Sequence, residues 1–130
     1  MKSLIKYTLV TVMLLICAPT WATGKSLNFE WEQAIGIEFT GWKLYMSETS
    51  GSYDYNAPFA TILYDGNPTG TYTTEQTVTV PSGNTVTKYF VLRAYNDTGP
   101  SDDSNEVSQM IDMTVPSVPF SLTVEITVTP

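Results

Sequence analysis

The stretch from Lys88 to Met113 constrains the fold more than any other part of the sequence. An aromatic and β-branched run up to Tyr95 is followed by ten residues of Asn, Asp, Thr, Gly, Pro and Ser, and a second run with apolar residues begins at Glu106. Two strands joined by a polar loop have this pattern. Because side chains alternate along a strand, one face of the first run carries Phe90, Leu92 and Ala94.

The rest of the chain contains shorter runs of the same kind, separated by clusters of turn residues. No window after the first 22 residues repeats its apolar residues with the period of a helix over ten residues, so we expect no helix there. Short strands at this spacing are typical of an all-β sandwich or barrel. The predicted strands are Leu27–Glu32, Trp42–Ser47, Ala60–Tyr64, Thr77–Val80, Lys88–Tyr95 and Glu106–Met113.

Residues 1–22 have the features of a secretory signal peptide. Lys2 and Lys6 precede an apolar run, and small residues stand at the minus-three and minus-one positions before a cleavage site after Ala22. The apolar run is too short to favour a membrane anchor, and bulky Ile16 disfavours a lipid anchor on Cys17. We therefore expect a protein that is secreted or held at the cell surface, with no membrane association after cleavage.

Cleavage after Ala22 would remove two of the six basic residues and none of the thirteen acidic ones, which takes the net charge from −7 to −9. A chain this acidic repels nucleic acid and anionic membrane surfaces. Cleavage would also remove the only cysteine, so the core has to stabilise the fold without a disulfide.

The chemistry of the sequence argues against an enzyme. The chain has no histidine, which excludes Ser-His-Asp and Cys-His catalysis and histidine-bound metals. Glu30 and Glu32 share the outer face of a predicted strand, where solvated surface charge explains them better than paired-carboxylate catalysis. We predict no catalytic activity and no cofactor. Asp97, Asp102 and Asp103 lie in one loop with oxygen ligands suited to calcium, but an acidic, solubilising turn is the better interpretation of this loop.

Several motifs resemble those of fibronectin type III domains, in the form common in secreted bacterial proteins. They are Trp31, the Gly-Trp-Lys-Leu-Tyr run from Gly41, the run from Tyr89 to Gly99, and Ser-Asn-Glu-Val-Ser from Ser104. The resemblance covers residues 26–112. It implies two antiparallel sheets packed as an immunoglobulin-like Greek-key sandwich over residues 23–113. The family opens with a further strand, but only Thr23–Ser26 separate the expected cleavage site from the tryptophan strand, so we expect that first strand to be missing or vestigial.

A proline-rich linker, residues 114–119, precedes a segment at 120–130 that alternates almost perfectly. The Pro-Phe-Ser-Leu-Thr-Val stretch resembles the first strand of the family, displaced to the other end of the chain. We therefore predict an extra C-terminal β-strand with one apolar face. The residues on that face are Leu122, Val124, Ile126 and Val128.

Three interpretations of this C-terminal strand remain open. It can return to its own sandwich, enter the vacant position in a second copy, or begin a further domain of which only this part is present. Six linker residues span at most ~20 Å, about the length of one strand, so a return to the opposite end of the same domain is strained. A neighbour stacked end to end lies within reach, and repeated contacts of this kind build a polymer.

A second candidate surface lies on the outer face of two neighbouring strands. Its residues are Tyr45, Val91, Arg93 and Tyr95. Tyrosines beside an arginine are suited to stack on a sugar or to anchor a protein partner, although ordinary cross-strand pairing explains them as well.

The sequence thus favours a non-catalytic structural module that assembles with itself. The alternative is a monomeric adhesion module that recognises a carbohydrate or a cell-surface protein.

Overall fold

The computed structural model describes residues 22–36 and 38–127 of the chain. The predicted signal peptide lies outside these residues, apart from Ala22. Every regular element in the described part of the chain is a β-strand, so the prediction of an all-β fold is confirmed. The strands are β1 (Ala22–Glu32), β2 (Gly41–Ser47), β3 (Ala60–Leu63), β4 (Thr71–Pro81), β5 (Thr85–Asn96), β6 (Gly99–Pro100) and β7 (Val107–Asp112).

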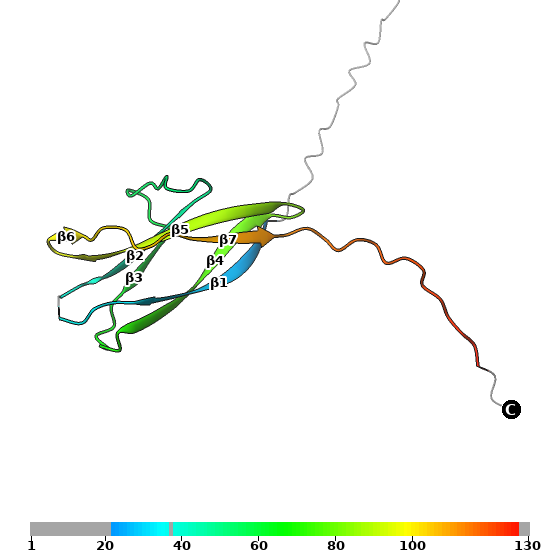
Figure 1. The fold of residues 1–130 in the computed structure, drawn as a ribbon, viewed down its shortest axis with the longest axis horizontal. Helices are drawn as coiled ribbons and strands as arrows, with labels where there is room; N and C mark the ends of the chain where they lie inside the picture. The colour runs from blue at the N-terminus through cyan, green and yellow to red at the C-terminus, as the bar shows by residue number, and fades with distance from the viewer. Residues whose placement is uncertain (1–21, 37, 128–130) are drawn as a thin grey trace, which may run out of the picture.

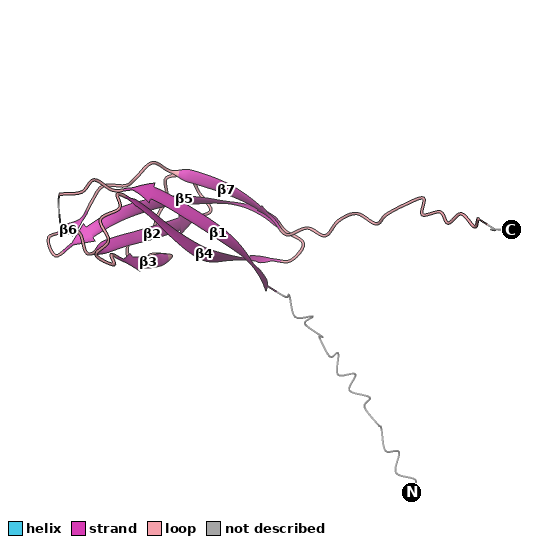
Figure 2. Ribbon diagram, turned by 90° about the horizontal axis from the view of Figure 1, so that it is seen from below, coloured by secondary structure: helices cyan, strands magenta, loops and turns pink. Residues whose placement is uncertain are grey.

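The strands form two antiparallel sheets that pack face to face, as the sequence predicts for a sandwich (Figure 1). One sheet has two strands, β1 and β4. The other has five, in the order β3-β2-β5-β6, with β7 pairing with a different part of β5. Figure 2 shows that the described elements are strands joined by loops.

β1 begins and β7 ends at the same end of the sandwich, which we call the tail pole. Here Ala22 at the start of β1 pairs with Pro81, and Thr85 at the start of β5 pairs with Asp112 at the end of β7. The turn between β4 and β5 closes this pole, with the Gly83 amide donating to the Met113 carbonyl at 2.9 Å. The opposite end carries β6, so we call it the β6 pole (Figure 1).

The core lies between the sheets, where alternate residues of each strand point inward. Its fully buried members come from β2, β4, β5 and β7 and are Leu44, Val78, Val80, Phe90 and Ile111. Toward the β6 pole the core becomes aromatic. There the ring of Trp42 packs at 4.6 Å from that of Tyr72 and at 5.1 Å from that of Trp31, measured between centroids. This arrangement confirms the inward face predicted for Phe90 and its neighbours.

Strand boundaries agree best where apolar residues alternate. β2 starts one residue before its prediction, whereas β1 and β4 are both much longer than predicted. Residues 23–26, which we expected only to precede a strand, belong to β1. The reason is that β1 and β4 pair continuously from Ala22–Pro81 to Glu32–Thr71, and backbone pairing takes in polar residues that carry no hydrophobic signal.

Residues 120–127 are not a strand in the single chain, so the predicted C-terminal strand is not docked in its own sandwich there, and its pairing with a second copy stays a prediction. The segment leaves the tail pole and extends away from the sandwich (Figure 1). Leu122, Val124 and Ile126 are 97%, 88% and 83% exposed. Val128, the fourth residue of the predicted row, lies outside the described residues. A strand needs a partner for its backbone groups, and this segment has none within the described part of its own chain.

Candidate functional site

The outer-face candidate site is assembled by the pairing of β2 with β5. Tyr45 lies opposite Val91, and Arg93 and Tyr95 follow on the same face of β5. The sequence therefore placed the four residues together correctly. The prediction that they face solvent is wrong for two of them, because Tyr45 is only 3% exposed and Val91 only 4%.

The loop between β2 and β3, residues 48–59, covers this face. The ring of Tyr55 packs edge-on against that of Tyr45, with 5.1 Å between centroids. On the same ring lies the guanidinium of Arg93, whose Cζ is 3.6 Å from the centroid. Tyr53 packs beside Tyr55 at 6.3 Å. Burial under this loop raises the pKa of Tyr45.

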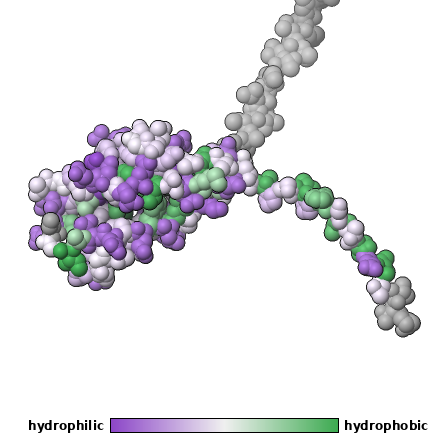
Figure 3. Space-filling model, in the orientation of Figure 1, coloured by the Kyte–Doolittle hydropathy of each residue, from purple (hydrophilic) through white to green (hydrophobic). Residues whose placement is uncertain are grey.

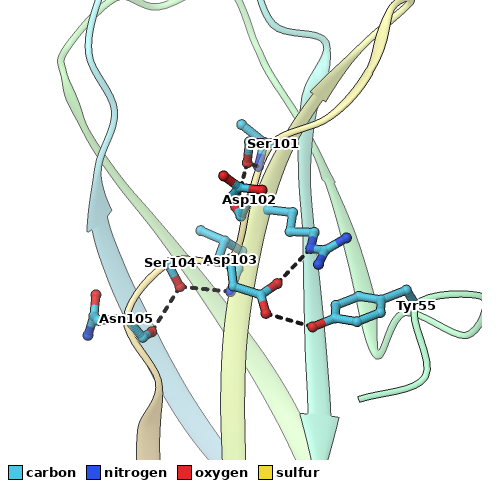
Figure 4. Close-up of polar contacts among 9 residues, drawn as sticks. Tyr55, Ser101, Asp102, Asp103, Ser104 and Asn105 are labelled. Atoms are coloured by element: carbon cyan, nitrogen blue, oxygen red, sulfur yellow. Dashed lines mark hydrogen bonds and ion pairs between the residues drawn. The ribbon is translucent and has the colours of Figure 1, made fainter. Parts of the chain in front are cut away.

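Asp103 joins the loop to the segment that precedes β7. One of its carboxylate oxygens accepts from the Tyr55 hydroxyl at 2.6 Å, and the other accepts from Nε of Arg93 at 2.6 Å (Figure 4). Partial burial opposes ionisation of Asp103, but these hydrogen bonds outweigh it and hold the pKa of the carboxyl below its ordinary value. The guanidinium of Arg93 therefore already has its binding partners within the molecule.

Glu106 makes a second connection to the same loop. Its carboxylate accepts three hydrogen bonds, from the Ser50 hydroxyl at 2.5 Å, the Tyr53 hydroxyl at 2.5 Å and the Gly51 amide at 2.8 Å. These donors lower the pKa of Glu106, while burial, together with the bond to Glu106, raises the pKa of Tyr53. The loop is thus tied down by two carboxylates.

We expect this loop to loosen as the pH falls below 4.5, the ordinary pKa of a glutamate. A lowered pKa in the folded state means that the stabilisation is complete above the ordinary value and is lost as Glu106 protonates through its lowered one. The Glu106→Gln variant should be loose at every pH, because the amide cannot accept all three bonds. Amide hydrogen exchange at Gly51 measures both effects when the rate is compared with the intrinsic rate of an unprotected amide at the same pH, and the protection of Gly51 should fall several-fold in each case.

Glu32→Gln is the matched control, since Glu32 is exposed on the outer face of β1 and lies far from the loop in the fold. Equal exchange at Gly51 in Glu106→Gln and Glu32→Gln would show that the carboxylate does not hold the loop.

The remaining sequence candidates gain no support as a ligand site. Tyr95 keeps a partner of its own, the ammonium of Lys43 at 5.0 Å from its ring centroid. Over residues 22–36 and 38–127, no three His, Cys, Asp or Glu side chains gather closely enough to hold a metal ion. Asp103 instead accepts hydrogen bonds from Tyr55 and Arg93. In that same part of the chain no helix is long and apolar enough to cross a membrane.

The other side of the sandwich has an open edge. Within the described residues β1 pairs only with β4, so its second edge has no neighbour. The inward-facing residues of β1 are only half-buried, and they are Leu27, Phe29 and Trp31. Their partners on β4, Gln76, Thr74 and Tyr72, are half-buried as well, whereas Val78 and Val80, nearer the tail pole, are 0% and 1% exposed. The core is therefore closed near the tail pole and more open along the rest of this sheet.

A groove follows this open edge between β1 and β7. Its apolar part is a cavity of about 100 Å³ lined by residues that include Phe29, Trp31, Phe90 and Val107. It continues toward the β6 pole as a wider cavity of about 510 Å³, which shares Trp31 and Leu92 with the first. We call the two together the β1–β7 groove. The wider part is more polar, because its lining includes Glu30, Glu32, Asp102 and Asp103.

Sequence reasoning did not identify the residues that line this groove. Phe29 and Trp31 alternate with polar residues as in any half-buried strand, and nothing local shows that their strand lies at an edge. Tyr53, Tyr55 and Glu106 were also missed. The sequence did carry a signal for the two tyrosines, because they stand in a loop otherwise rich in Ser, Gly, Asp and Asn. Aromatic side chains in such a polar loop usually pack over a neighbouring part of the protein.

Fold and site together define an all-β sandwich protein with one sheet of only two strands and an exposed apolar tail. No family model, no curated protein and no solved structure matches the chain.

Proposed function

We propose that this chain is a non-catalytic, exported module of fibronectin type III-like kind with a structural function: copies join when the tail of one completes the two-stranded sheet of another. One observation carries the proposal. The tail exposes an apolar row at Leu122, Val124 and Ile126, while β1 of the same chain has a half-buried apolar row beside an unpaired edge. Figure 3 shows the apolar tail residues standing clear of the sandwich.

Burial would give this contact a substantial driving force. Leu, Val and Ile side chains each contribute about 1.5–3 kcal/mol when they pass from water into an apolar site, so three contribute roughly 5–9 kcal/mol before ordering costs. The backbone of the tail would gain hydrogen bonds along the edge of β1, as in other strand additions. An exposed row and an open edge are both liabilities that proteins ordinarily cover.

The alternative function, recognition of a carbohydrate or a cell-surface protein, has less support. The outer face proposed for it is covered by residues 48–59, and Arg93 is engaged by Asp103. A ligand would have to displace that loop or bind through Tyr95 alone.

Removing residues 120–130 tests the proposed function. We expect the full chain to form concentration-dependent oligomers in size-exclusion chromatography with light scattering, and fibres or rings in electron microscopy. The truncated chain should be a monomer with the same β-rich circular dichroism spectrum, because the described core makes no use of the tail.

Thr123→Ser with Thr127→Ser is the matched control, since it changes the tail but keeps its apolar row, and it should assemble like the unaltered chain. A full chain that stays monomeric at every accessible concentration would overturn the proposed function.

A further inference from the structure

The direction in which a tail can enter the β1–β7 groove follows from the positions of the two poles. β1 starts at the tail pole and runs toward the β6 pole, and β7 ends at the tail pole, where the tail leaves. A segment antiparallel to β1 must therefore enter the groove at the β6 pole and run toward the tail pole.

The tail of the same chain cannot reach that entry point. β1 has 11 residues, which corresponds to a length of ~36 Å. The linker of residues 114–119 spans at most ~20 Å even when fully extended. Only a segment parallel to β1, made by an immediate reversal after Met113, is within reach of its own groove. Parallel pairing is slightly less stable per residue than antiparallel pairing.

A second copy meets the requirement without strain. When the β6 pole of one copy faces the tail pole of another, the tail enters the neighbouring groove directly. Each copy then donates its tail at one pole and accepts a tail along its β1 edge. A contact of this kind is heterologous, so it repeats along a line or closes into a ring.

We propose that the β1–β7 groove accepts residues 121–127 of a second copy, antiparallel to β1, with Leu122 opposite Trp31, Val124 opposite Phe29 and Ile126 opposite Leu27. This inference rests on the proposed function and specifies its acceptor site. The register sets three inward apolar residues of the tail against the three half-buried residues of β1. The polar residues of the tail then face outward beside Ser26, Asn28 and Glu30.

Charge favours this register over the two neighbouring registers, each of which is shifted by two residues. In the proposed register Glu125 lies opposite Asn28. A shift of two residues in one direction places Glu125 opposite Glu30, and like charges directly opposite each other destabilise a strand pair. The opposite shift places Ile126 beside Lys25, a charged residue, and takes it away from Leu27. The proposed register avoids both conflicts.

Disulfide trapping in the full chain tests the direction and the register. Cys17→Ser removes the only native cysteine. In this background Glu30→Cys combined with Thr123→Cys should give a ladder of covalent oligomers on non-reducing gels, because opposite positions on paired strands are close enough to bridge. Ser26→Cys combined with Thr123→Cys is the matched control and should give none, since an antiparallel tail keeps these positions four residues apart along the strand.

The other outcomes separate the two proposals. A cross-link between positions 26 and 123, whether inside one chain or between two, overturns the proposed antiparallel register. Oligomers that form while neither pair cross-links overturn the groove as acceptor and leave self-assembly standing. A chain that forms no oligomers overturns both the acceptor site and the proposed function.

Discussion

Replacing Trp42 by alanine should lower the free energy of unfolding by about 3–5 kcal/mol, the range found for large aromatic residues removed from cores. Trp42 is 2% exposed, and its ring contacts those of Trp31, Phe39 and Tyr72 at 5.1, 5.0 and 4.6 Å between centroids. Its Nε1 also donates to the side-chain oxygen of Gln33 at 3.2 Å. The alanine variant therefore loses aromatic packing and one hydrogen bond. Chemical denaturation followed by circular dichroism measures the loss.

Leu63→Ala is the control for this substitution. Leu63 lies on β3 in the same sheet but is 70% exposed, so its truncation should change stability by less than about 0.5 kcal/mol. If Trp42→Ala does not fold, Trp42→Phe should give an intermediate loss, because it keeps a ring in the cluster. Equal stability of Trp42→Ala and Leu63→Ala would mean that the aromatic cluster does not support the sandwich.

The Trp42 cluster also bears on assembly. Trp31 lines both parts of the β1–β7 groove and is packed from behind by Trp42. A chain with Trp42→Phe that still folds should therefore accept a tail less well, because Trp31 is held less firmly. The link is one of packing: core stability and the shape of the open edge depend on the same rings.

Strands could be predicted from the sequence where local alternation is strong. β2 shows this best, since apolar and polar residues alternate along it and only its first residue, Gly41, was missed. β4 shows the limit. Its first half runs through Thr73, Glu75 and Gln76, which give no hydrophobic signal, and it becomes a strand because β1 lies beside it. Pairing between distant segments extends a strand beyond the region where its own residues indicate one.

The candidate sites show the same limit more sharply. Alternation placed Tyr45 and Arg93 on one face, but whether that face meets solvent depends on hydrogen bonds between residues far apart in the sequence. Tyr53 and Glu106 are separated by 53 positions and Tyr55 and Asp103 by 48. The tail is the converse case. Its alternation describes a segment able to form a strand, but the strand forms only where a partner edge is available.

Replacing Gly41 by alanine is the second large effect that we expect, a loss of about 1–3 kcal/mol from overpacking. Gly41 lies at the start of β2, between Leu63 of β3 and Tyr95 of β5. A Cβ built at this position clashes with the carbonyl oxygen of Ile62 and lies 3.1 Å from the Cα of Leu63. Both contacts are with the backbone of a paired strand, so β3 would have to move away from β2. Thermal and chemical denaturation measure the loss.

Gly24→Ala separates this clash from the general effect of adding a methyl group to a strand. At Gly24 the new Cβ would meet only the Cγ2 methyl of Thr77, at 2.5 Å, and a threonine side chain on an exposed face can rotate away. Alanine also narrows the conformations of the unfolded chain, which favours folding by about 0.4–1 kcal/mol wherever the native backbone accepts it. Gly24→Ala should therefore be close to neutral while Gly41→Ala is clearly destabilising. Equal changes in the free energy of unfolding at the two positions would mean that β3 can move away from β2 without loss of stability. The pairing of β2 with β3 would then not hold this edge of the sandwich in place.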